Sequence, residues 1–257
     1  MRLAGKSIVI TGATGIAAAA AHEVAHQGGK VFVIAIDDKD CHSLISELVA
    51  GGATAGFRDA DLTVEAEADA AFEAAVSFLG GFDGLFAVAG GSGRPFGDGP
   101  AHELTLEAWE KTVRANASPM FLAVRNAIRH FGDLGGSIVV VSSVLATSPS
   151  PHLFATHAYA ASKGAANAYV TALASYYAVA GIRVNAIAPG LVRTPMSARA
   201  AAHPETVAYA SRKQPLAGGF LEPEAIADAA VFLLSDESSQ ITGQVLSVDG
   251  GWGVTEA

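Results

Sequence analysis

Short apolar runs alternate with longer amphipathic stretches along the whole chain. The runs are rich in Val and Ile and apolar on both faces, which is typical of buried strands in a parallel sheet. The predicted strands are residues 7–10, 31–36, 53–57, 85–89, 137–142, 183–188 and 245–248. The predicted helices are residues 17–27, 40–50 with Asp40 as cap, 63–79 with Thr63 as cap, 106–131, 158–180 and 223–234.

This alternation has the spacing of βα units and predicts an α/β fold with a doubly wound parallel sheet, covered by helices on both faces. No linker or low-complexity segment interrupts the pattern, so a single domain over residues 1–257 is expected. In such sheets ligands gather at the carboxyl ends of the strands. Candidate functional residues are therefore sought directly after each strand.

Composition and charge narrow the classes of protein. Apolar residues make up 51% and charged residues 16%, which excludes a disordered chain. The net charge of −9 argues against a nucleic-acid partner, because basic patches bind phosphate backbones. No apolar run reaches the roughly 18 residues of a membrane span, so no membrane association is expected. Cys41 is the single cysteine, so no intrachain disulfide can form and a cytoplasmic location is expected.

The segment Thr11-Gly12-Ala13-Thr14-Gly15 follows the first strand and precedes an alanine-rich helix. Glycines at this point permit a tight turn, and the N-terminus of the helix offers free N–H groups to a pyrophosphate. Two glycines alone are also compatible with an ordinary strand–helix turn. The position after the first strand of an α/β chain favours a dinucleotide-binding loop.

A second motif overlaps the same helix. His22-Glu23-Val24-Ala25-His26 matches H-E-x-x-H, which places two imidazoles and a carboxylate on one helix in zinc peptidases. A catalytic zinc needs three protein ligands, and Phe32 occupies the position of the third ligand in the extended motif. We therefore expect no metal site and keep a zinc hydrolase as the least favoured alternative.

Tyr159 and Lys163 lie four residues apart and share one face of a predicted helix. A nearby cation favours the phenolate, which brings a tyrosine closer to use as an acid or base. Ser143 ends a predicted strand, and Asn116 lies within a long helix. Each of these residues taken alone is equally compatible with a structural role.

In combination these residues make the chain resemble a short-chain dehydrogenase/reductase of the classical type. The resemblance extends from Lys6 to Trp252. It rests on TGATG, Asp61-Leu62, Ala89-Gly90, Asn116, Ser143, Tyr159, Lys163, NAIAPGLVRTPM and ITGQVLSVDGGW.

The resemblance implies a Rossmann-type fold and hydride transfer between a nicotinamide cofactor and a secondary alcohol or ketone. It implies that Tyr159 exchanges the substrate proton and that Ser143 holds the substrate oxygen. Lys163 would lower the pKa of Tyr159 and bind the nicotinamide ribose, and Asn116 would position a water in a proton relay. The implied cofactor contacts are Gly12, Thr14, Gly15, Ile16, Asp37, Asp61, Leu62, Ala89, Gly90, Tyr159, Lys163, Pro189, Gly190, Val192 and Thr194.

The chain departs from the family pattern in two places. The glycine loop is one residue shorter than the usual T-G-x-x-x-G-x-G, and Ala17 or Ala18 replaces its last glycine. After the second strand, neither the acidic residue typical of NAD enzymes nor the basic residue typical of NADP enzymes is present. Asp37 lies close by and would repel a 2′-phosphate, which favours NAD. An NADP-dependent ketoreductase and a non-catalytic nucleotide-sensing protein remain the alternatives.

The expected substrate loops are residues 92–100, 145–157 and 192–220. Apolar residues around Phe154 favour a neutral or partly hydrophobic small-molecule substrate, although His152 or His157 could touch it. Arg94, Arg193 and Arg199 are interpreted as surface arginines, with contact to an anionic substrate as the alternative. The resemblance also implies a homodimer or homotetramer, often formed through the helices here at about 106–131 and 158–180.

Overall fold

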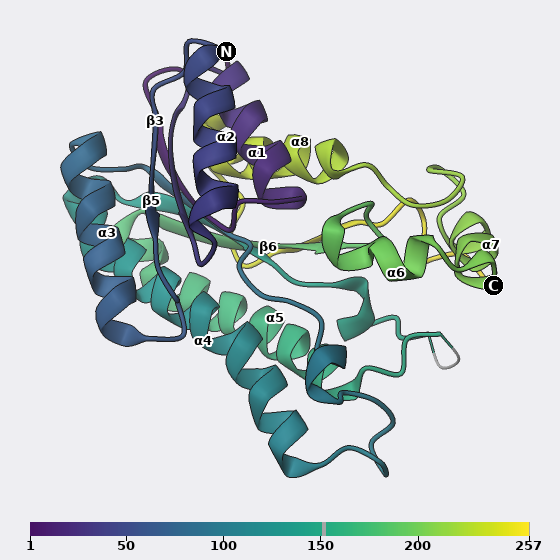
Figure 1. The fold of residues 1–257 in the computed structure, drawn as a ribbon. Coiled ribbons are helices and arrows are strands. Elements are labelled where there is room, and N and C mark those ends of the chain that lie inside the picture. The colour runs from purple at the N-terminus through teal and green to yellow at the C-terminus, as the bar shows by residue number, and fades with distance from the viewer. Residues whose placement is uncertain (151–152, 257) are drawn as a thin grey trace.

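Seven parallel strands form one sheet in the order β3-β2-β1-β4-β5-β6-β7 in the computed structural model, which describes residues 1–150 and 153–256 (Figure 1). The strands are β1 (Ser7–Thr11), β2 (Lys30–Ala35), β3 (Ala55–Asp59), β4 (Gly84–Ala87), β5 (Gly136–Val141), β6 (Ile182–Pro189) and β7 (Val245–Val248). The strand order reverses between β1 and β4. A crevice outside the carboxyl ends of the strands is expected at such a reversal.

Helices cover both faces of the sheet. One face carries α1 (Ile16–His26), α2 (Asp38–Ala50) and α8 (Pro223–Leu234), and the other carries α3 (Glu65–Leu79), α4 (Leu106–His130) and α5 (His157–Tyr177) (Figure 1). Successive residues of β1 alternate between the two cores, with Ile8 and Ile10 in one and Val9 in the other. The predicted Rossmann-type doubly wound sheet in a single domain is confirmed.

The alanine-rich stretch of α1 is a packing surface. Ala17, Ala20 and Ala21 are buried, and α1 packs against α8. A Cβ on Gly12 would lie 3.2 Å from the Ala17 Cβ, so small side chains on both sides let the helix start close to the loop after β1. Here Ala17 serves the close-packing role that glycine has in the usual loop.

Two predicted helix starts are wrong. Asp37, not Asp40, caps α2, because the Asp37 side chain accepts a hydrogen bond from the Asp40 N–H at 3.1 Å. Thr63 does not cap α3, which begins at Glu65, because the Thr63 N–H donates to Asp61 Oδ1 at 2.8 Å and is held in a turn before the helix.

The predicted loop at 192–220 also holds two helices that the pattern did not indicate, α6 (Ala198–Ala201) and α7 (Pro204–Lys213). Both helices project beyond the carboxyl ends of the strands, near the C-terminus (Figure 1). None of the described helices combines the length and the hydropathy required to cross a bilayer.

Candidate active site and cofactor cleft

Two neighbouring strands are joined just beyond their carboxyl ends by the side chain of Thr11. Its Oγ1 accepts hydrogen bonds from the N–H groups of Val88 and Ala89, each at 3.0 Å. The hydroxyl therefore fixes the segment after β4 beside the glycine loop after β1. This contact brings two of the predicted cofactor segments together.

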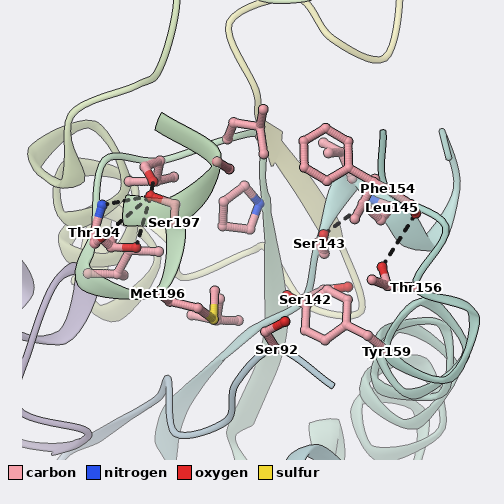
Figure 2. Close-up of a pocket in the computed structure, with 18 of the residues that line it drawn as sticks. Ser92, Ser142, Ser143, Leu145, Phe154, Thr156, Tyr159, Thr194, Met196 and Ser197 are labelled. Atoms are coloured by element: carbon pink, nitrogen blue, oxygen red, sulfur yellow. Dashed lines mark hydrogen bonds between the residues drawn. The ribbon is translucent and has the colours of Figure 1, made fainter. Parts of the chain in front are cut away.

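A cavity of about 310 Å³, here called the Tyr159 cavity, opens beyond β5 and β6. Ser143 and Tyr159 lie on one wall, and Thr194, Met196 and Ser197 lie on the wall opposite (Figure 2). Its lining includes Ile16, Ser92, Arg94, Ser143, Leu145, Phe154, Tyr159, Pro189, Gly190, Leu191, Val192, Thr194, Met196, Arg199 and Trp252. The three predicted substrate loops all contribute to this lining.

Ser143 and Tyr159 approach each other from different elements. Ser143 follows β5, and its Oγ accepts a hydrogen bond from the Leu145 N–H at 3.2 Å, which leaves its own proton free to donate. Burial raises the pKa of the Tyr159 phenol, and the nearby Ser143 hydroxyl acts in the opposite direction. The pair can therefore present one donor and one acid/base group to a substrate oxygen.

Lys163 lies one helical turn after Tyr159 on α5 and is buried. Its Nζ donates to the Val141 carbonyl at 2.8 Å and lies 5.7 Å from the centre of the Tyr159 ring. Burial lowers the pKa of the Lys163 ammonium to about 8. The lysine therefore stands behind the tyrosine and does not line the cavity itself.

Asn116 lies inside α4 and is also buried. Its Nδ2 donates to the carbonyls of Gly91 at 3.0 Å and Thr112 at 2.9 Å, and its Oδ1 accepts from the Gly91 N–H at 3.1 Å. The side chain thus fixes the segment after β4. A Cβ on Gly90, whose φ is +152°, would lie 2.8 Å from Asn116 Oδ1, so this position requires glycine.

A carboxylate from the loop after β4 holds the start of α5. Asp98 is buried, and its two oxygens accept hydrogen bonds from the N–H groups of Ala158 at 3.0 Å and Tyr159 at 2.9 Å. Thr156 occupies the N-cap position but forms no capping bond with its side chain. Asp98 therefore fixes the backbone of Tyr159 from a different segment of the chain.

A second cavity of about 460 Å³, here called the Asp37 cavity, lies beyond β1, β2, β3 and β4. Ser92 lines both cavities, so they adjoin at this residue. The titratable side chains in the lining of the Asp37 cavity are Asp37, Asp40 and Asp61. The electrostatic environment of this cavity is therefore acidic.

The carboxylates near this cavity also act on the buried thiol of Cys41. Its pKa is raised to about 11 by burial and by the nearby carboxylates Asp38, Asp59, Asp37 and Asp40. The thiol is consequently neutral and unreactive at physiological pH. The acidic residues after β2 and β3 act as one negative cluster.

The N-terminus of α1 lies where the pyrophosphate of a dinucleotide that spans the two cavities would be expected. The start of α1 lies between them, with Ile16 in the lining of the Tyr159 cavity and Thr14 in that of the Asp37 cavity. Among the described residues no side chain caps this helix, and its first turn carries no acidic residue. Its N–H groups and positive dipole end are thus available to a pyrophosphate.

The predicted cofactor residues divide between the cavities. Ile16, Tyr159, Pro189, Gly190, Val192 and Thr194 line the Tyr159 cavity, and Gly12, Thr14, Asp37, Asp61, Leu62, Ala89 and Gly90 line the Asp37 cavity. Three predicted residues, Gly15, Asn116 and Lys163, line neither cavity and support them from behind. A Cβ on Gly15 would lie 2.8 Å from the Thr194 Cγ2, so glycine lets the loop after β6 approach α1.

Two buried residues support the site without having been singled out from the sequence. Asp98 fixes α5, as described above. Gln214 fixes the turn after β6: its Oε1 accepts from the Leu191 N–H at 2.5 Å, and its Nε2 donates to the Leu191 carbonyl at 3.2 Å. The hydrogen bonds of Asp98 to α5 and of Gln214 to Leu191 join residues distant in sequence, so no local motif marks them, although Gln214 Nε2 also donates to the nearby Gly219 carbonyl.

Neither His157 nor the two histidines of the H-E-x-x-H stretch line the Tyr159 cavity. His157 accepts a hydrogen bond from the Ala101 N–H at Nδ1, at 3.0 Å, and His152 lies outside the described residues. In the H-E-x-x-H stretch, His22 Nε2 lies 3.4 Å from Glu47 Oε2. Within residues 1–150 and 153–256 there is no cluster of three metal-ligating side chains.

Comparison with known proteins finds relatives of this chain over nearly its whole length. Residues 11–253 match the family described as enoyl-(acyl carrier protein) reductase. The chain is 37% identical to 3beta-hydroxysteroid dehydrogenase 1 of Eggerthella lenta, over 97% of this chain and 94% of that protein. It is 35% identical to a 2,5-dichloro-2,5-cyclohexadiene-1,4-diol dehydrogenase of Sphingobium indicum, over 98% of both chains. A solved short-chain type dehydrogenase/reductase from Mycobacterium ulcerans superposes with a TM-score of 0.92 at 29% identity, over 100% of this chain and 93% of that chain.

Proposed function

Since the chain belongs to the short-chain dehydrogenase/reductase family, we propose that it oxidises a cyclic secondary alcohol with NAD, using Tyr159 as acid/base. The chain is an NAD(P)-dependent oxidoreductase that acts on small-molecule alcohols or ketones. We propose these residue roles, this cofactor and this substrate class because Ser143 and Tyr159 line one cavity, with Lys163 buried behind them.

The proposed mechanism assigns one task to each side chain. In alcohol oxidation the Ser143 hydroxyl donates to the substrate oxygen and holds it beside Tyr159, whose phenolate oxygen takes the hydroxyl proton. A nicotinamide cofactor, which residues 189–194 would hold, would supply the hydride acceptor, so that loss of the hydride from the carbinol carbon and of the proton to Tyr159 would leave a ketone. Lys163, in its protonated form, stabilises the phenolate. Asn116 fixes the loop after β4 and positions a water that returns the proton to solvent.

The acidic lining of the Asp37 cavity supports NAD over NADP. A 2′-phosphate bound there would face Asp37 and Asp40, together with the wider negative cluster that raises the pKa of Cys41. An unmodified ribose instead offers two hydroxyl donors to the Asp37 carboxylate. The glycine loop, Asp61-Leu62 and Ala89-Gly90 would hold the remainder of the adenosine diphosphate, and residues 189–194 the nicotinamide end.

A cyclic substrate is supported by the shape and composition of the Tyr159 cavity. Phe154 and Trp252 form an edge-to-face aromatic pair with ring centres 6.1 Å apart, and Leu145, Leu191 and Met196 complete an apolar lining. Both relatives described above are named for ring-bearing alcohols, a hydroxysteroid and a cyclohexadienediol. The volume of about 310 Å³ favours a small ring compound.

We also propose that the chain works in the cytoplasm as a homodimer or homotetramer. Leu106, Trp109 and Phe121 of α4 and Tyr176 of α5 are large apolar side chains left exposed on the monomer. Their positions support an interface on these two helices. Light scattering coupled to gel filtration measures the assembly, and a monomer at micromolar concentration would contradict it.

Two measurements test the proposed function. Fluorescence titration with NADH and NADPH should show tighter binding of NADH, and Asp37→Ala should reduce the preference. Tyr159→Phe should bind NADH normally but lose at least about a thousandfold in kcat, because it removes the phenolic hydroxyl that acts as acid/base.

Each alternative has its own outcome. Tighter NADPH binding would favour the NADP-dependent ketoreductase. Nucleotide binding without turnover of any alcohol or ketone would favour the nucleotide-sensing protein, and near-normal turnover in Tyr159→Phe would overturn the catalytic assignment.

A further inference from the structure

Two arginines from separate segments line the same cavity as the proposed acid/base. Arg94 lies in the loop after β4, and Arg199 lies in α6. Both contribute to the lining of the Tyr159 cavity, together with Ser143 and Tyr159. Arg193, the third arginine of these loops, is absent from the lining and forms an ion pair with Glu222 at 2.9 Å.

The two arginines are both exposed and share the lining of one cavity. The pKa of Arg94 is lowered first by burial and second by the charge of Arg199. Arg94 Nη2 donates to the Leu153 carbonyl at 3.0 Å, so the Arg94 side chain is held at the cavity. Two exposed like charges at one cavity repel each other through screening solvent, and an anion bound between them would offset that repulsion.

Carboxylates of the described residues leave both arginines without an ion pair. Within residues 1–150 and 153–256, neither arginine forms a salt bridge. Asp98 acts on Arg94 in the attractive direction, but both of its oxygens already accept hydrogen bonds from the start of α5. The planar donors of an arginine bind an oxyanion in two parallel hydrogen bonds, so the pair is suited to an anionic ligand.

We propose that the substrate is a cyclic alcohol that carries an anionic group, such as a carboxylate, which Arg94 and Arg199 bind while the ring contacts the apolar lining. This inference rests on the proposed function and replaces the neutral substrate expected from the sequence. The hydroxyl of such a substrate reaches Ser143 and Tyr159, and its charged end faces the two arginines. Arg94 and Arg199 are then specificity residues, not acid/base groups.

The experiment compares matched charged and neutral alcohols. The purified protein is assayed with NAD and 3- and 4-hydroxycyclohexanecarboxylates, with their methyl esters and with 4-methylcyclohexanol. A hydroxycyclohexanesulfonate distinguishes a general oxyanion site from one specific for carboxylates. We expect kcat/KM to be at least about tenfold higher for a carboxylate than for its ester, since hydrogen bonds to charged groups are the stronger ones.

Substitutions of the arginines test whether they cause the preference for charged alcohols. Arg199→Ala should lower kcat/KM for the carboxylate about tenfold, mainly through KM, and should lower the value for 4-methylcyclohexanol by a much smaller factor, because the neutral alcohol lacks the charged group. Arg199→Glu should lower it further, and Arg94→Lys should give a partial loss because the charge remains. Arg212→Ala removes an exposed arginine of α7 that does not line the cavity, so it controls for net charge and should have no effect.

The outcomes separate the inference from the proposed function. The inference would be overturned if carboxylates and their esters had equal kcat/KM, or if Arg199→Ala lowered kcat/KM equally for charged and neutral alcohols. In either case, oxidation of 4-methylcyclohexanol would still support the proposed function. If no alcohol of either kind were oxidised although NADH bound, the proposed function itself would fail.

Discussion

The carboxylate of Asp98 offers a direct test of how the site is assembled. Asp98 supplies two hydrogen bonds to the first turn of α5, one of them to the backbone of Tyr159. The helix has no capping bond from Thr156, whose Oγ1 donates to the Phe154 carbonyl at 3.4 Å. Replacement of Asp98 by Ala leaves two N–H groups at the start of the helix without their acceptor.

The expected loss of stability follows from these contacts. Loss of an N-cap costs about 0.5–2 kcal/mol, and one hydrogen bond to a charged group contributes about 1.5–3 kcal/mol. These terms describe overlapping interactions and do not add, so Asp98→Ala should lower the free energy of unfolding by about 2–4 kcal/mol. Asp98→Asn retains one acceptor oxygen and places an amide against the second N–H, so about half of that loss is expected.

Activity should fall with stability, but for a separate reason. Tyr159 depends on Asp98 for the position of its backbone, and small displacements of a catalytic group reduce turnover strongly. We expect kcat of Asp98→Ala to fall at least about tenfold at a temperature where the variant is folded. NADH affinity should change little, because Asp98 lines neither cavity.

The assay is urea unfolding followed by circular dichroism at one protein concentration, combined with steady-state kinetics. Asp133→Ala is the matched control, because Asp133 is exposed and its side chain forms no hydrogen bond within the described part of the chain. The reasoning would be refuted if Asp98→Ala changed the free energy of unfolding by less than about 0.5 kcal/mol, as ordinary surface substitutions do, and left kcat unchanged.

Two further substitutions test the charge and the loop behind the site. Lys163→Met should abolish most activity yet raise the free energy of unfolding at pH 7 by about 2 kcal/mol, because the folded pKa of about 8 lies below the unfolded value of about 10.5. The burial cost of the ammonium is present in full below pH 8 and is lost as the pH rises toward 10.5. The free energies of unfolding of the two proteins, measured with urea, should therefore converge over that interval. A constant difference between them would contradict the burial argument. Gly15→Ala places a Cβ 2.8 Å from Thr194 Cγ2 at a φ of +55°. This variant should bind NADH at least about tenfold more weakly in a fluorescence titration. Gly164→Ala, which has open space at its Cβ, is the control and should bind NADH normally.

The sheet could be predicted from the sequence because its determinants are local. Each buried strand reads as a continuous apolar run, and each amphipathic helix separates two such runs, so the alternation specifies a doubly wound sheet. Helix starts were less predictable. Asp37, Asp38 and Asp40 are all suitable near a helix start, and only the backbone path after β2 makes Asp37 the cap.

The chemistry of the site was predictable where residues follow strands and unpredictable where they act across the fold. Ser143 and Tyr159 come from separate elements, but each carries a local signal. The two hydrogen bonds of Asp98 span 60 and 61 residues, and those of Gln214 to Leu191 span 23, with no periodicity to mark them. The same holds for Arg94 and Arg199, which read as surface arginines until the loops bring them to one cavity.

The charge of the two cavities differs in a way that bears on both ligands. The Asp37 cavity carries carboxylates, and the Tyr159 cavity carries two arginines, although the chain as a whole has a net charge of −9. The net charge of the chain repels anions weakly at long range, and a local positive pair favours the binding of an anionic substrate at this cavity. Both arginines line a largely apolar cavity but are themselves exposed, so solvent screens part of their attraction for an anion. Under the two proposals made above, the acidic cavity would take the unphosphorylated ribose and the Tyr159 cavity the charged alcohol, and the carboxylates of the Asp37 cavity would disfavour an anionic substrate there.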